Sequence, residues 1–295
     1  MYFATKMLSR LKTYGMYFLT PFFPEWCSKV LFRWAFGRRL DLRHPITLNE
    51  KLMWLKLNSY RHDKRVTCCT DKYAVREYVR ECGCGEILNE LYGVWDSPEK
   101  IDWESLPPEF VLKCNHASGF NIICESKAEL DIKACMKQLR KWMRRDFWRY
   151  SAEMQYCGIP KRIICERRLG RNGPPADYKF YCFHGEPVCV LVCCEREKGW
   201  PHFYFFDCDW NFMPITRDGK KEKPDFMLPR PEHFSQMVEY ARRLSAPFPF
   251  VRVDLYDTDG AVVFGELTFT PSACLDTGRL PETDKMLGEL LKIDL

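Results

Sequence analysis

Apolar and polar residues alternate most clearly along residues 250–269. The first half, FVRVDLYD, has the period of two that is typical of a half-buried strand, and the second half, AVVFGELTF, is an apolar-rich run. Between them, the glycine of Thr258-Asp259-Gly260 supplies the positive φ that a tight loop needs. The pattern therefore predicts a β-hairpin with a three-residue loop.

The register of this hairpin decides which side chains share a face. A three-residue loop pairs Arg252 with Glu266 and Asp254 with Phe264, and directly opposed residues project to the same side. Arg252, Asp254, Glu266 and Thr268 would then lie together. A two-residue loop would separate the two carboxylates unless a bulge corrected the register.

The charged side chains on this face need partners, because an unpaired charge in a core costs roughly several kcal/mol. One interpretation is an ion pair between Arg252 and Glu266 that caps the sheet edge. The other is a magnesium site in which Asp254 and Glu266 supply hard oxygen ligands to a metal that also holds phosphates. The hairpin alone favours the ion pair.

Hydrophobic periodicity predicts further elements along the chain. Apolar stripes at helical spacing predict helices over residues 47–57, 70–82, 132–148 and 232–244. Apolar runs bounded by turn residues predict strands over residues 106–112, 121–124, 161–169, 178–183, 188–193 and 202–206, the later ones forming an antiparallel sheet. Near the start of the first helix, Asn49-Glu50-Lys51 is interpreted as solvated charge, with contact to an acceptor substrate as the alternative.

Residues 1–40 are aromatic and basic. Met7, Leu8, Leu11 and Tyr14 form a helical stripe, which predicts a helix that either lies on a membrane surface or packs on the protein's own core; we favour the core. The uncharged run at residues 13–24 is too short to span a bilayer, and no signal peptide is visible.

Composition adds constraints on partners and compartment. The net charge of +5 suits a polyanionic ligand or an anionic membrane surface without requiring either. The 16 cysteines form no C-x-x-C pair, which argues against metal and disulfide frameworks and indicates reduced thiols in a cytosol. The basic helix at residues 132–148 is interpreted as a solvated face, with a surface for an acidic polysaccharide as the alternative.

Two lysines occupy positions that suit a nucleotide. Lys113 ends a predicted strand and precedes a small-residue loop at residues 115–119, so the ammonium and the loop N–H groups are placed for phosphate oxygens. The loop matches no Walker pattern. Lys179 shares a strand face with Asp177, which indicates either a phosphate contact or a buried salt bridge.

The hairpin motif resembles a known family. Arg252-x-Asp254 followed by Glu266-x-Thr268-x-Thr270-Pro271 is similar to the metal-binding end of the ATP-grasp superfamily of carboxylate–amine ligases, where the pattern is R-x-D and then E-x-N-x-x-P. Within the superfamily the chain resembles the TupA-like branch of teichuronopeptide biosynthesis. The phrases that carry this resemblance span nearly the whole chain in order: NEKLMWLKL, DKYAVREYV, FVLKCNHASG, DYKFYCFHGEP, FPFVRVDLY and FGELTFTP.

The resemblance implies an α+β fold, the ATP-grasp fold, in which two lobes with antiparallel sheets enclose the nucleotide. Residues 1–69 would form a short helical N-terminal segment in place of the fuller α/β domain that family members often carry. Residues 70–295 would form the ATP-grasp domain, with a small lobe at about 105–168 and a large lobe at about 177–295.

The resemblance also assigns roles to residues. It implies that Asp254, Glu266 and Thr268 hold Mg²⁺, with threonine in place of the usual asparagine, and that Arg252 and Lys179 act in catalysis. It implies nucleotide contacts from Lys72, Lys113, His116, Ser118, Gly119, Glu166, Arg167 and Leu169. Backbone groups at residues 166–169 would read the adenine edge of ATP.

The implied activity is ATP-dependent ligation of a carboxylate to an amine through an acyl phosphate, with release of ADP and phosphate. The substrates would be a uronic-acid or peptidyl carboxylate of a cell-surface polysaccharide and an amino-acid amine. The enzyme would act in the cytoplasm, with membrane contact through the N-terminal helix as an option and with no nucleic-acid partner.

Two other classes of function stay open. A nucleotide-sugar glycosyltransferase usually has a D-x-D metal motif, and the matches here, Asp257-Thr258-Asp259 and Asp207-Cys208-Asp209, stand at turn positions where aspartate is expected anyway. A glycan-binding scaffold without catalysis is the third class. The sequence names neither the sugar nor the amine, and it does not give the oligomeric state.

Overall fold

The computed structural model describes residues 15–170, 175–194, 202–223 and 225–295. The helices are α2 (Pro24–Phe36), α3 (Leu48–Leu57), α4 (Lys64–Thr70), α5 (Val75–Glu81), α6 (Ile132–Met143), α7 (Phe234–Ser245) and α8 (Pro281–Leu290). The strands are β1 (Leu91–Trp95), β2 (Phe110–Cys114), β3 (Asn121–Cys124), β4 (Ile163–Glu166), β5 (Asp177–Phe183), β6 (Glu186–Cys194), β7 (His202–Asp207), β8 (Phe212–Met213), β9 (Phe250–Thr258) and β10 (Ala261–Thr268).

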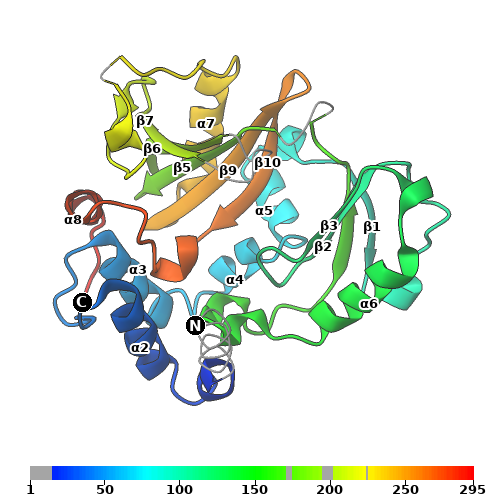
Figure 1. The fold of residues 1–295 in the computed structure, drawn as a ribbon, viewed down its shortest axis with the longest axis horizontal. Helices are drawn as coiled ribbons and strands as arrows, with labels where there is room; N and C mark the ends of the chain where they lie inside the picture. Colours follow the sequence, from blue (N-terminus) through cyan, green and yellow to red (C-terminus); the bar gives the residue numbers. More distant parts are fainter. Residues whose placement is uncertain (1–14, 171–174, 195–201, 224) are drawn as a thin grey trace, which may run out of the picture.

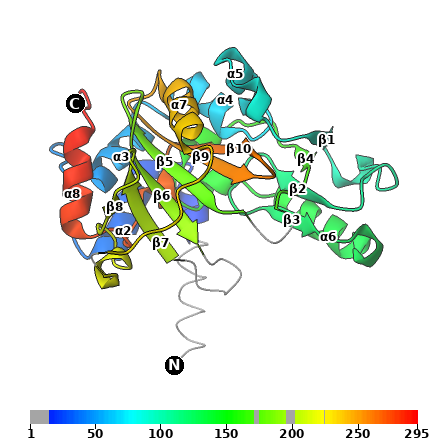
Figure 2. The ribbon, with the colours of Figure 1, turned by 90° about the horizontal axis from the view of Figure 1, so that it is seen from above.

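The strands form two antiparallel sheets. One sheet has four strands in the order β1-β4-β2-β3, and the other has six in the order β10-β9-β5-β6-β7-β8. Figure 1 shows the two sheets side by side, and in Figure 2, seen from above, they also lie next to each other without overlapping. The predicted α+β architecture with two antiparallel sheets is confirmed.

The six-stranded sheet has one apolar and one polar face. Val251, Val253 and Leu255 of β9 project to the apolar face, which α7 covers with Phe234 and Met237. Figure 2 shows α7 lying over one face of this sheet. The alternate positions of β9 and β5 therefore point away from α7, and they carry the charged side chains of the site.

The four-stranded sheet repeats this arrangement. Phe110 and Leu112 of β2 pack with Cys165 of β4 and with Leu139 of α6 in a second hydrophobic core. The intervening residues of β2 and β4, Lys113 among them, point to the opposite face, because successive side chains of a strand alternate. Each sheet thus turns one polar face away from its covering helix.

The N-terminal helices join the larger core. Phe32 of α2 and Leu48 of α3 belong to the same buried cluster as Phe250 of β9. Helix α3 packs closely on α8, where a Cβ at Gly288 would come within 2.3 Å of the carbonyl oxygen of Ile46. Whether residues 1–69 and the two sheets are separate domains stays a prediction. Strand β1 lies before the predicted start of the small lobe at about 105.

The start of α3 is not solvated, so that interpretation is wrong. Asn49 is fully buried and accepts a hydrogen bond from Arg279, and Glu50 accepts one from the backbone N–H of Thr47 in a capping box. Lys51 donates to the carbonyl oxygens of Gly288 and Leu291 at 2.8 Å. These polar groups attach the N-terminal helices to the chain around α8.

The hairpin differs from the predicted register but keeps the predicted face. Its turn has two residues, Asp259 and Gly260, both with positive φ, which is the type that matches the twist of a hairpin. A bulge at Gly265 then shifts the register, so Glu266 pairs with Asp254. Arg252 pairs with Thr268, not with Glu266 as predicted. The bulge compensates for the short turn and returns all four side chains to one face.

Three other predicted elements have different bounds. The helix expected over residues 70–82 begins only at Val75, because the Asp71 carboxylate accepts hydrogen bonds from the backbone N–H of Tyr73 and from Asn115. The strand expected from residue 106 begins at Phe110, since the prolines before it cannot donate to a sheet. The helix expected to reach residue 148 ends at Met143.

The surface around α2 is rich in exposed aromatic residues, including Phe22, Phe23 and Trp26. The predicted stripe at Met7, Leu8, Leu11 and Tyr14 lies outside the described residues, so its membrane or core contact stays a prediction. Among the helices that the structure describes, none has the length and apolar character to cross a membrane. All the cysteines are free thiols, as their spacing indicated.

Candidate functional site

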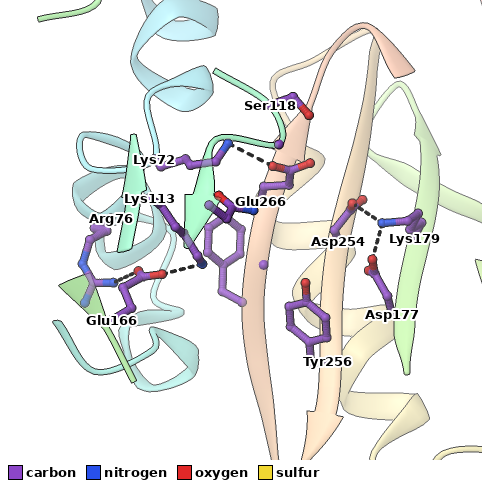
Figure 3. A pocket seen from close by; sticks show the side chains of 14 residues that line it. Lys72, Arg76, Lys113, Ser118, Glu166, Asp177, Lys179, Asp254, Tyr256 and Glu266 are labelled. Carbon is purple, nitrogen blue, oxygen red and sulfur yellow. Dashed lines mark hydrogen bonds and ion pairs between the residues drawn. The ribbon is translucent and has the colours of Figure 1, made fainter. Parts of the chain in front are cut away.

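A cavity of about 330 Å³ lies between the polar faces of the two sheets. Its lining combines charged side chains from both sheets with Lys72, from the segment before α5, and Arg76 of α5 (Figure 3). The lining residues are Lys72, Arg76, Lys113, Ser118, Gly119, Asn121, Glu166, Asp177, Lys179, Asp254, Tyr256, Phe264, Gly265 and Glu266. Cations and carboxylates thus alternate around one enclosed space.

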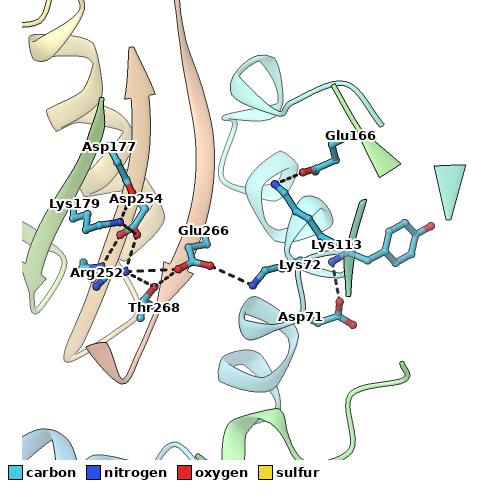
Figure 4. Close-up of polar contacts among 11 residues, drawn as sticks. Asp71, Lys72, Lys113, Glu166, Asp177, Lys179, Arg252, Asp254, Glu266 and Thr268 are labelled. Carbon is cyan, nitrogen blue, oxygen red and sulfur yellow. Dashed lines mark hydrogen bonds and ion pairs between the residues drawn. The ribbon is translucent and has the colours of Figure 1, made fainter. Parts of the chain in front are cut away.

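The hairpin supplies the carboxylates of one wall. Arg252 binds Asp254 through two hydrogen bonds of 2.7 Å, from Nε and from Nη2, and its Nη2 lies 3.1 Å from Thr268 Oγ1. The Thr268 hydroxyl donates to Glu266 Oε1 at 3.0 Å. Figure 4 shows this chain of contacts along β9 and β10. The four residues that sequence alternation grouped on one face do lie together.

Lys179 of β5 is held between two buried carboxylates. Its Nζ lies 2.8 Å from Asp254 Oδ2 and 2.5 Å from Asp177 Oδ2. Burial lowers the pKa of Lys179, but the two carboxylates outweigh burial and the pKa is raised. The lysine therefore stays charged, and a buried salt bridge is present. The role of Lys179 in catalysis stays a prediction.

Glu266 is ionised by the cations around it. Burial raises its pKa, but Lys72, Arg252 and Lys179 outweigh burial and hold the pKa at about 2. Lys72 Nζ lies 3.3 Å from Glu266 Oε2, across the cavity from the hairpin (Figure 4). At neutral pH this side chain therefore presents a carboxylate, which is the form that a metal ion requires.

The position of Lys72 depends on the loop at residues 115–119. Its backbone N–H donates to the carbonyl oxygen of Asn115 at 3.3 Å, and the Asn115 amide donates to Asp71 at 2.8 Å. These contacts fix the segment before α5 against the loop that presents Ser118 and Gly119 to the cavity. Gly119 has a φ of +73°, a conformation that glycine adopts without steric cost.

Lys113 and Glu166 project from neighbouring strands to the same face of the four-stranded sheet. Lys113 Nζ lies 2.6 Å from Glu166 Oε2, and Arg76 Nη1 lies 3.2 Å from Glu166 Oε1. Glu166 thus bridges two cations at the cavity. Arg76 was not predicted, although it lies four residues after Lys72, the spacing at which side chains of a helix are neighbours.

In the segment predicted to read the adenine edge, residues 166–169, part of the backbone already makes hydrogen bonds within the protein. The backbone N–H of Arg167 donates to Glu90, and its carbonyl oxygen accepts from the Asn89 amide. Both backbone groups of Arg167 are therefore engaged within the protein. The Arg167 side chain lies 3.9 Å from Asp259. Contacts from Glu166 and Leu169 to a base stay predictions, and Leu169 is not among the lining residues.

Ile123 is a further candidate that sequence reasoning missed. Its side chain is 63% exposed, although it belongs to the apolar run of β3, which is an edge strand. Ile123 pairs with Val111, so both residues share the face of β2 and β3 that carries Lys113. Ile123 is not among the residues that line the cavity, so a contact between its side chain and a bound base is a hypothesis.

His116 does not contact the cavity, in contrast to its predicted role. Its side chain is 2% exposed, its ring lies edge-on to Phe120, and it is absent from the lining. Burial, with a smaller contribution from Lys161, lowers its pKa to about 4. The imidazole is therefore neutral at pH 7, so it is poorly suited to bind a phosphate directly.

The donor set at the hairpin fits magnesium. The described part of the chain has no group of three or more acidic, histidine or cysteine side chains arranged for a metal. Mg²⁺ does not need one, because it commonly uses one or two carboxylates together with substrate phosphates and water. Asp254 and Glu266 are cross-strand partners at the cavity, and the cations there are already close to carboxylates. A triphosphate in this space would therefore require a divalent counter-ion.

The two D-x-D matches lie outside the cavity. Asp257 accepts hydrogen bonds from His233, with 2.8 Å to its Nδ1, and Asp259 occupies the hairpin turn. Asp207 accepts from the backbone N–H groups of Asp209 and Asn211. Asp207 and Asp259 thus lie at turns, where aspartate is common, whereas Asp257 links β9 to the residue before α7.

Comparison with known proteins relates the chain to ATP-grasp proteins. A family model described as TupA-like ATPgrasp matches residues 50–292. Among solved structures, D-alanine–D-alanine ligase from Bacillus anthracis complexed with ATP matches at 14% identity with a TM-score of 0.45, over 75% of this chain and 60% of that one. The chain thus spans less than two thirds of the length of that ligase. No curated protein gave a match.

Two further solved structures are similar. D-alanine–D-alanine ligase from Helicobacter pylori matches at 12% identity with a TM-score of 0.43, over 83% of this chain and 69% of that one. The N5-carboxyaminoimidazole synthase from Aspergillus clavatus, in complex with ADP and 5-aminoimidazole ribonucleotide, matches at 13% identity with a TM-score of 0.42, over 69% and 45%.

Proposed function

The chain belongs to the TupA-like ATP-grasp family, within the ATP-grasp ligase superfamily, and we propose that it is an ATP-dependent carboxylate–amine ligase. One observation carries the proposal. The cavity between the sheets places three lysines, Lys72, Lys113 and Lys179, around the paired carboxylates Asp254 and Glu266. Phosphate-binding cations beside a magnesium-type carboxylate pair are suited to phosphoryl transfer.

The lysines bind the phosphates of ATP in this proposal. Lys113 makes one ion pair, with Glu166, and an ammonium has three donors, so further donors are available for phosphate oxygens. Lys72 reaches the cavity from the segment before α5, on the same side as Lys113 and facing the hairpin (Figure 3). The loop at Ser118 and Gly119 supplies backbone N–H groups. Ile123 supports the base.

Asp254 and Glu266 would hold Mg²⁺, which supplies charge neutralisation at the phosphates. Arg252 and Lys179 place positive charge next to both carboxylates. They help to lower the pKa of Glu266, whereas at Asp254 burial outweighs them and raises the pKa. Thr268 fixes the orientation of Glu266 through its hydroxyl hydrogen bond. The chain thus presents a pre-formed set of oxygen donors at one edge of the cavity.

The chemistry follows in two balanced steps. A carboxylate oxygen of the acceptor attacks the γ-phosphorus of ATP, which forms an acyl phosphate and releases ADP. An amine then attacks the acyl carbon, the C–O bond to phosphate breaks, and the products are an amide, inorganic phosphate and a proton. Arg252 stabilises the negative oxygen of the tetrahedral intermediate by donating hydrogen bonds.

We propose substrates from the branch of the family to which the chain belongs. The carboxylate would be a uronic acid or a peptidyl group of a cell-surface polysaccharide precursor, and the amine would come from an amino acid. The mildly basic net charge of +5 is compatible with an acidic polymer. The cavity lining does not favour a nucleotide-sugar glycosyltransferase, since neither D-x-D candidate contributes a residue to it.

The nucleotide product tests this function. The protein is incubated with Mg-ATP, amino acids and either uronic-acid oligosaccharides or glutamyl peptides, the nucleotides are separated by chromatography, and hydroxylamine traps an acyl phosphate as a hydroxamate. ADP formation that requires the carboxylate, with a hydroxamate on trapping, supports the ligase. AMP as the product, or UDP release from a UDP-sugar with ATP unchanged, contradicts it.

A further inference from the structure

A second cavity, of about 380 Å³, adjoins the first on the same face of the six-stranded sheet. Lys179 lines both cavities, and Arg252 lines the second while Asp254 lines the first. Tyr181 pairs with Arg252 across β5 and β9, and Phe205 pairs with Leu191 in the row that contains Lys179. Tyr181, Leu191 and Phe205 therefore form an apolar floor for the second cavity, on the sheet face that also carries Lys179 and Arg252.

Two loops form the walls of this cavity. One contains Arg217 and Lys221, and the other contains Asp276 and Arg279. An isolated bridge between Thr216 and Arg279 joins them. Charged side chains thus surround an apolar floor, and both loops come from the same side of the sheet as the nucleotide cavity.

In the walls of the second cavity, each carboxylate has a cationic partner, and one arginine has no ion pair to a described residue. Asp276 accepts from Arg279 at 2.9 Å and from the backbone N–H of Gly278 at 2.8 Å. Asp218 pairs with Lys221 at 3.2 Å. Arg217 is exposed and makes no ion pair within the described ranges of the chain. The walls therefore offer a free guanidinium but no free carboxylate.

A second donor faces this cavity at its inner end. Arg252 uses Nε and Nη2 to bind Asp254 and Thr268, and its Nη1 makes no hydrogen bond to any residue that the structure describes. Arg252 marks the boundary with the nucleotide cavity. Arg217, in contrast, also lines a third cavity of about 630 Å³ that reaches Phe36 and Ile46. The two guanidinium groups thus lie towards opposite ends of the second cavity.

We propose that this second cavity binds an acidic acceptor with at least two anionic groups. The reactive carboxylate lies at Arg252, the second anionic group lies at Arg217, and the carbon skeleton between them lies on Tyr181 and Phe205. This inference rests on the proposed ligase function. A volume of about 380 Å³ falls within the range of roughly 300–1,000 Å³ that suits drug-sized ligands. The third cavity shares Arg217, Asp276 and Arg279 with the second, so it adjoins the end at which a longer chain would continue.

An acidic oligomer fits these observations better than a free amino acid. The ammonium of an amino acid requires an unneutralised carboxylate, and both wall carboxylates already have cationic partners. Arginine matches the planar geometry of carboxylates, so two arginines at a distance select a ligand by the spacing of its acidic groups. Oligouronates and glutamyl peptides share this chemistry.

The experiment measures binding to the full chain by calorimetry, in the absence of nucleotide. Digalacturonate is compared with galacturonate in one arm, and γ-glutamylglutamate is compared with glutamate in the other. We expect the dimeric ligand of one arm to bind at least about tenfold more tightly than its monomer, as expected for one added charge-assisted contact. Arg217→Ala should abolish that advantage and leave the affinity for the monomer unchanged.

Lys220→Ala is the matched control. Lys220 lies three residues from Arg217, carries the same charge and pairs with Glu282 at 2.5 Å, but it does not line the second cavity. This variant should keep the preference for the dimer. The arm that shows the preference identifies the source, a uronate or a peptide.

Several outcomes overturn the proposal: equal affinity for dimer and monomer, an unchanged preference in Arg217→Ala, or binding of neither acid. Thermal shift with Mg-ATP on the same protein separates this failure from failure of the ligase. If ATP stabilises the protein and neither acid binds, only the acceptor assignment is wrong. If ATP does not bind either, the ligase function itself is wrong.

Discussion

Glu266 lies directly opposite Asp254 in the hairpin because a bulge at Gly265 shifts the register of β10 by one residue. The two-residue turn alone would place the two carboxylates on opposite faces of the sheet, since a one-residue slip inverts every side chain. A Cβ at Gly265 would lie 2.9 Å from the carbonyl oxygen of Asp254 and 3.0 Å from the Tyr256 ring. The placement of both carboxylates on one face therefore depends on the absence of a side chain at this position.

Gly265→Val should displace the bulge and separate the carboxylates. We expect a loss of stability of about 1–3 kcal/mol, as for other overpacked sites, and loss of Mg²⁺-dependent ATP binding. Thermal unfolding and calorimetry with Mg-ATP measure the two effects. Gly15→Ala is the control, because no atom lies within 4 Å of a Cβ there. A Gly265→Val protein with normal Mg²⁺-dependent binding would contradict this account.

Asp254→Asn and Glu266→Gln should each reduce ATP turnover by about two orders of magnitude or more, because each removes a charged metal ligand. The amides keep the shape of the side chains, so thermal unfolding should show a folded protein. Turnover is measured over a range of Mg²⁺ concentrations. Normal turnover by either variant at low Mg²⁺ would show that the metal assignment is wrong.

Local sequence patterns predicted the face of the hairpin but not its pairing. Alternation along β9 grouped Arg252 and Asp254 correctly, since it depends only on the geometry of one strand. The register depends on the turn and the bulge together. The turn is one residue shorter than predicted and the bulge at Gly265 was not predicted, but the bulge adds one residue and returns the side chains to the predicted face. The helix predicted over residues 70–82 begins late because Asp71 binds Asn115. Asn115 lies 44 residues away along the chain, so helical periodicity could not predict this contact.

The residues that sequence reasoning missed become visible only through sheet order. Ile123 looks like a buried strand residue until β3 is found at the edge of the four-stranded sheet, with one face open. For Glu166, which was predicted to contact the nucleotide, sheet order reveals the partner, because β4 lies beside β2 and brings Glu166 to Lys113. His116 was grouped with the phosphate loop by position, whereas its ring is buried and lies edge-on to Phe120.

Lys113→Ala should weaken binding of ATP more than binding of adenosine, because the lost contact is to phosphate. We expect a loss of about tenfold in Kd for ATP, which corresponds to about 1.4 kcal/mol. Calorimetry with both ligands measures the difference. Lys133→Ala, an exposed lysine on α6, provides a control for loss of charge. Equal weakening of both ligands would indicate a folding defect instead.

Ile123→Ser should have the complementary effect. If the exposed side chain of Ile123 supports the base, the substitution removes an apolar contact with the base. Binding of adenosine and of ATP should then weaken by the same factor, about tenfold in Kd for a loss of roughly 1.4 kcal/mol. The fold should persist, because the side chain is 63% exposed. Binding of inorganic triphosphate should not change, and a loss of triphosphate affinity would show that Ile123 acts through the phosphate loop.

His116 should make stability depend on pH between about 4 and 6.5. Burial lowers its pKa to about 4 in the folded protein, whereas an unfolded histidine titrates near 6.5. Between these values only the unfolded state binds the proton, so stability falls as the pH is lowered from 6.5 to 4, by about 3 kcal/mol. Chemical unfolding at several pH values measures this loss. In His116→Phe it should disappear, and parallel curves for the two proteins would show that another group controls acid stability.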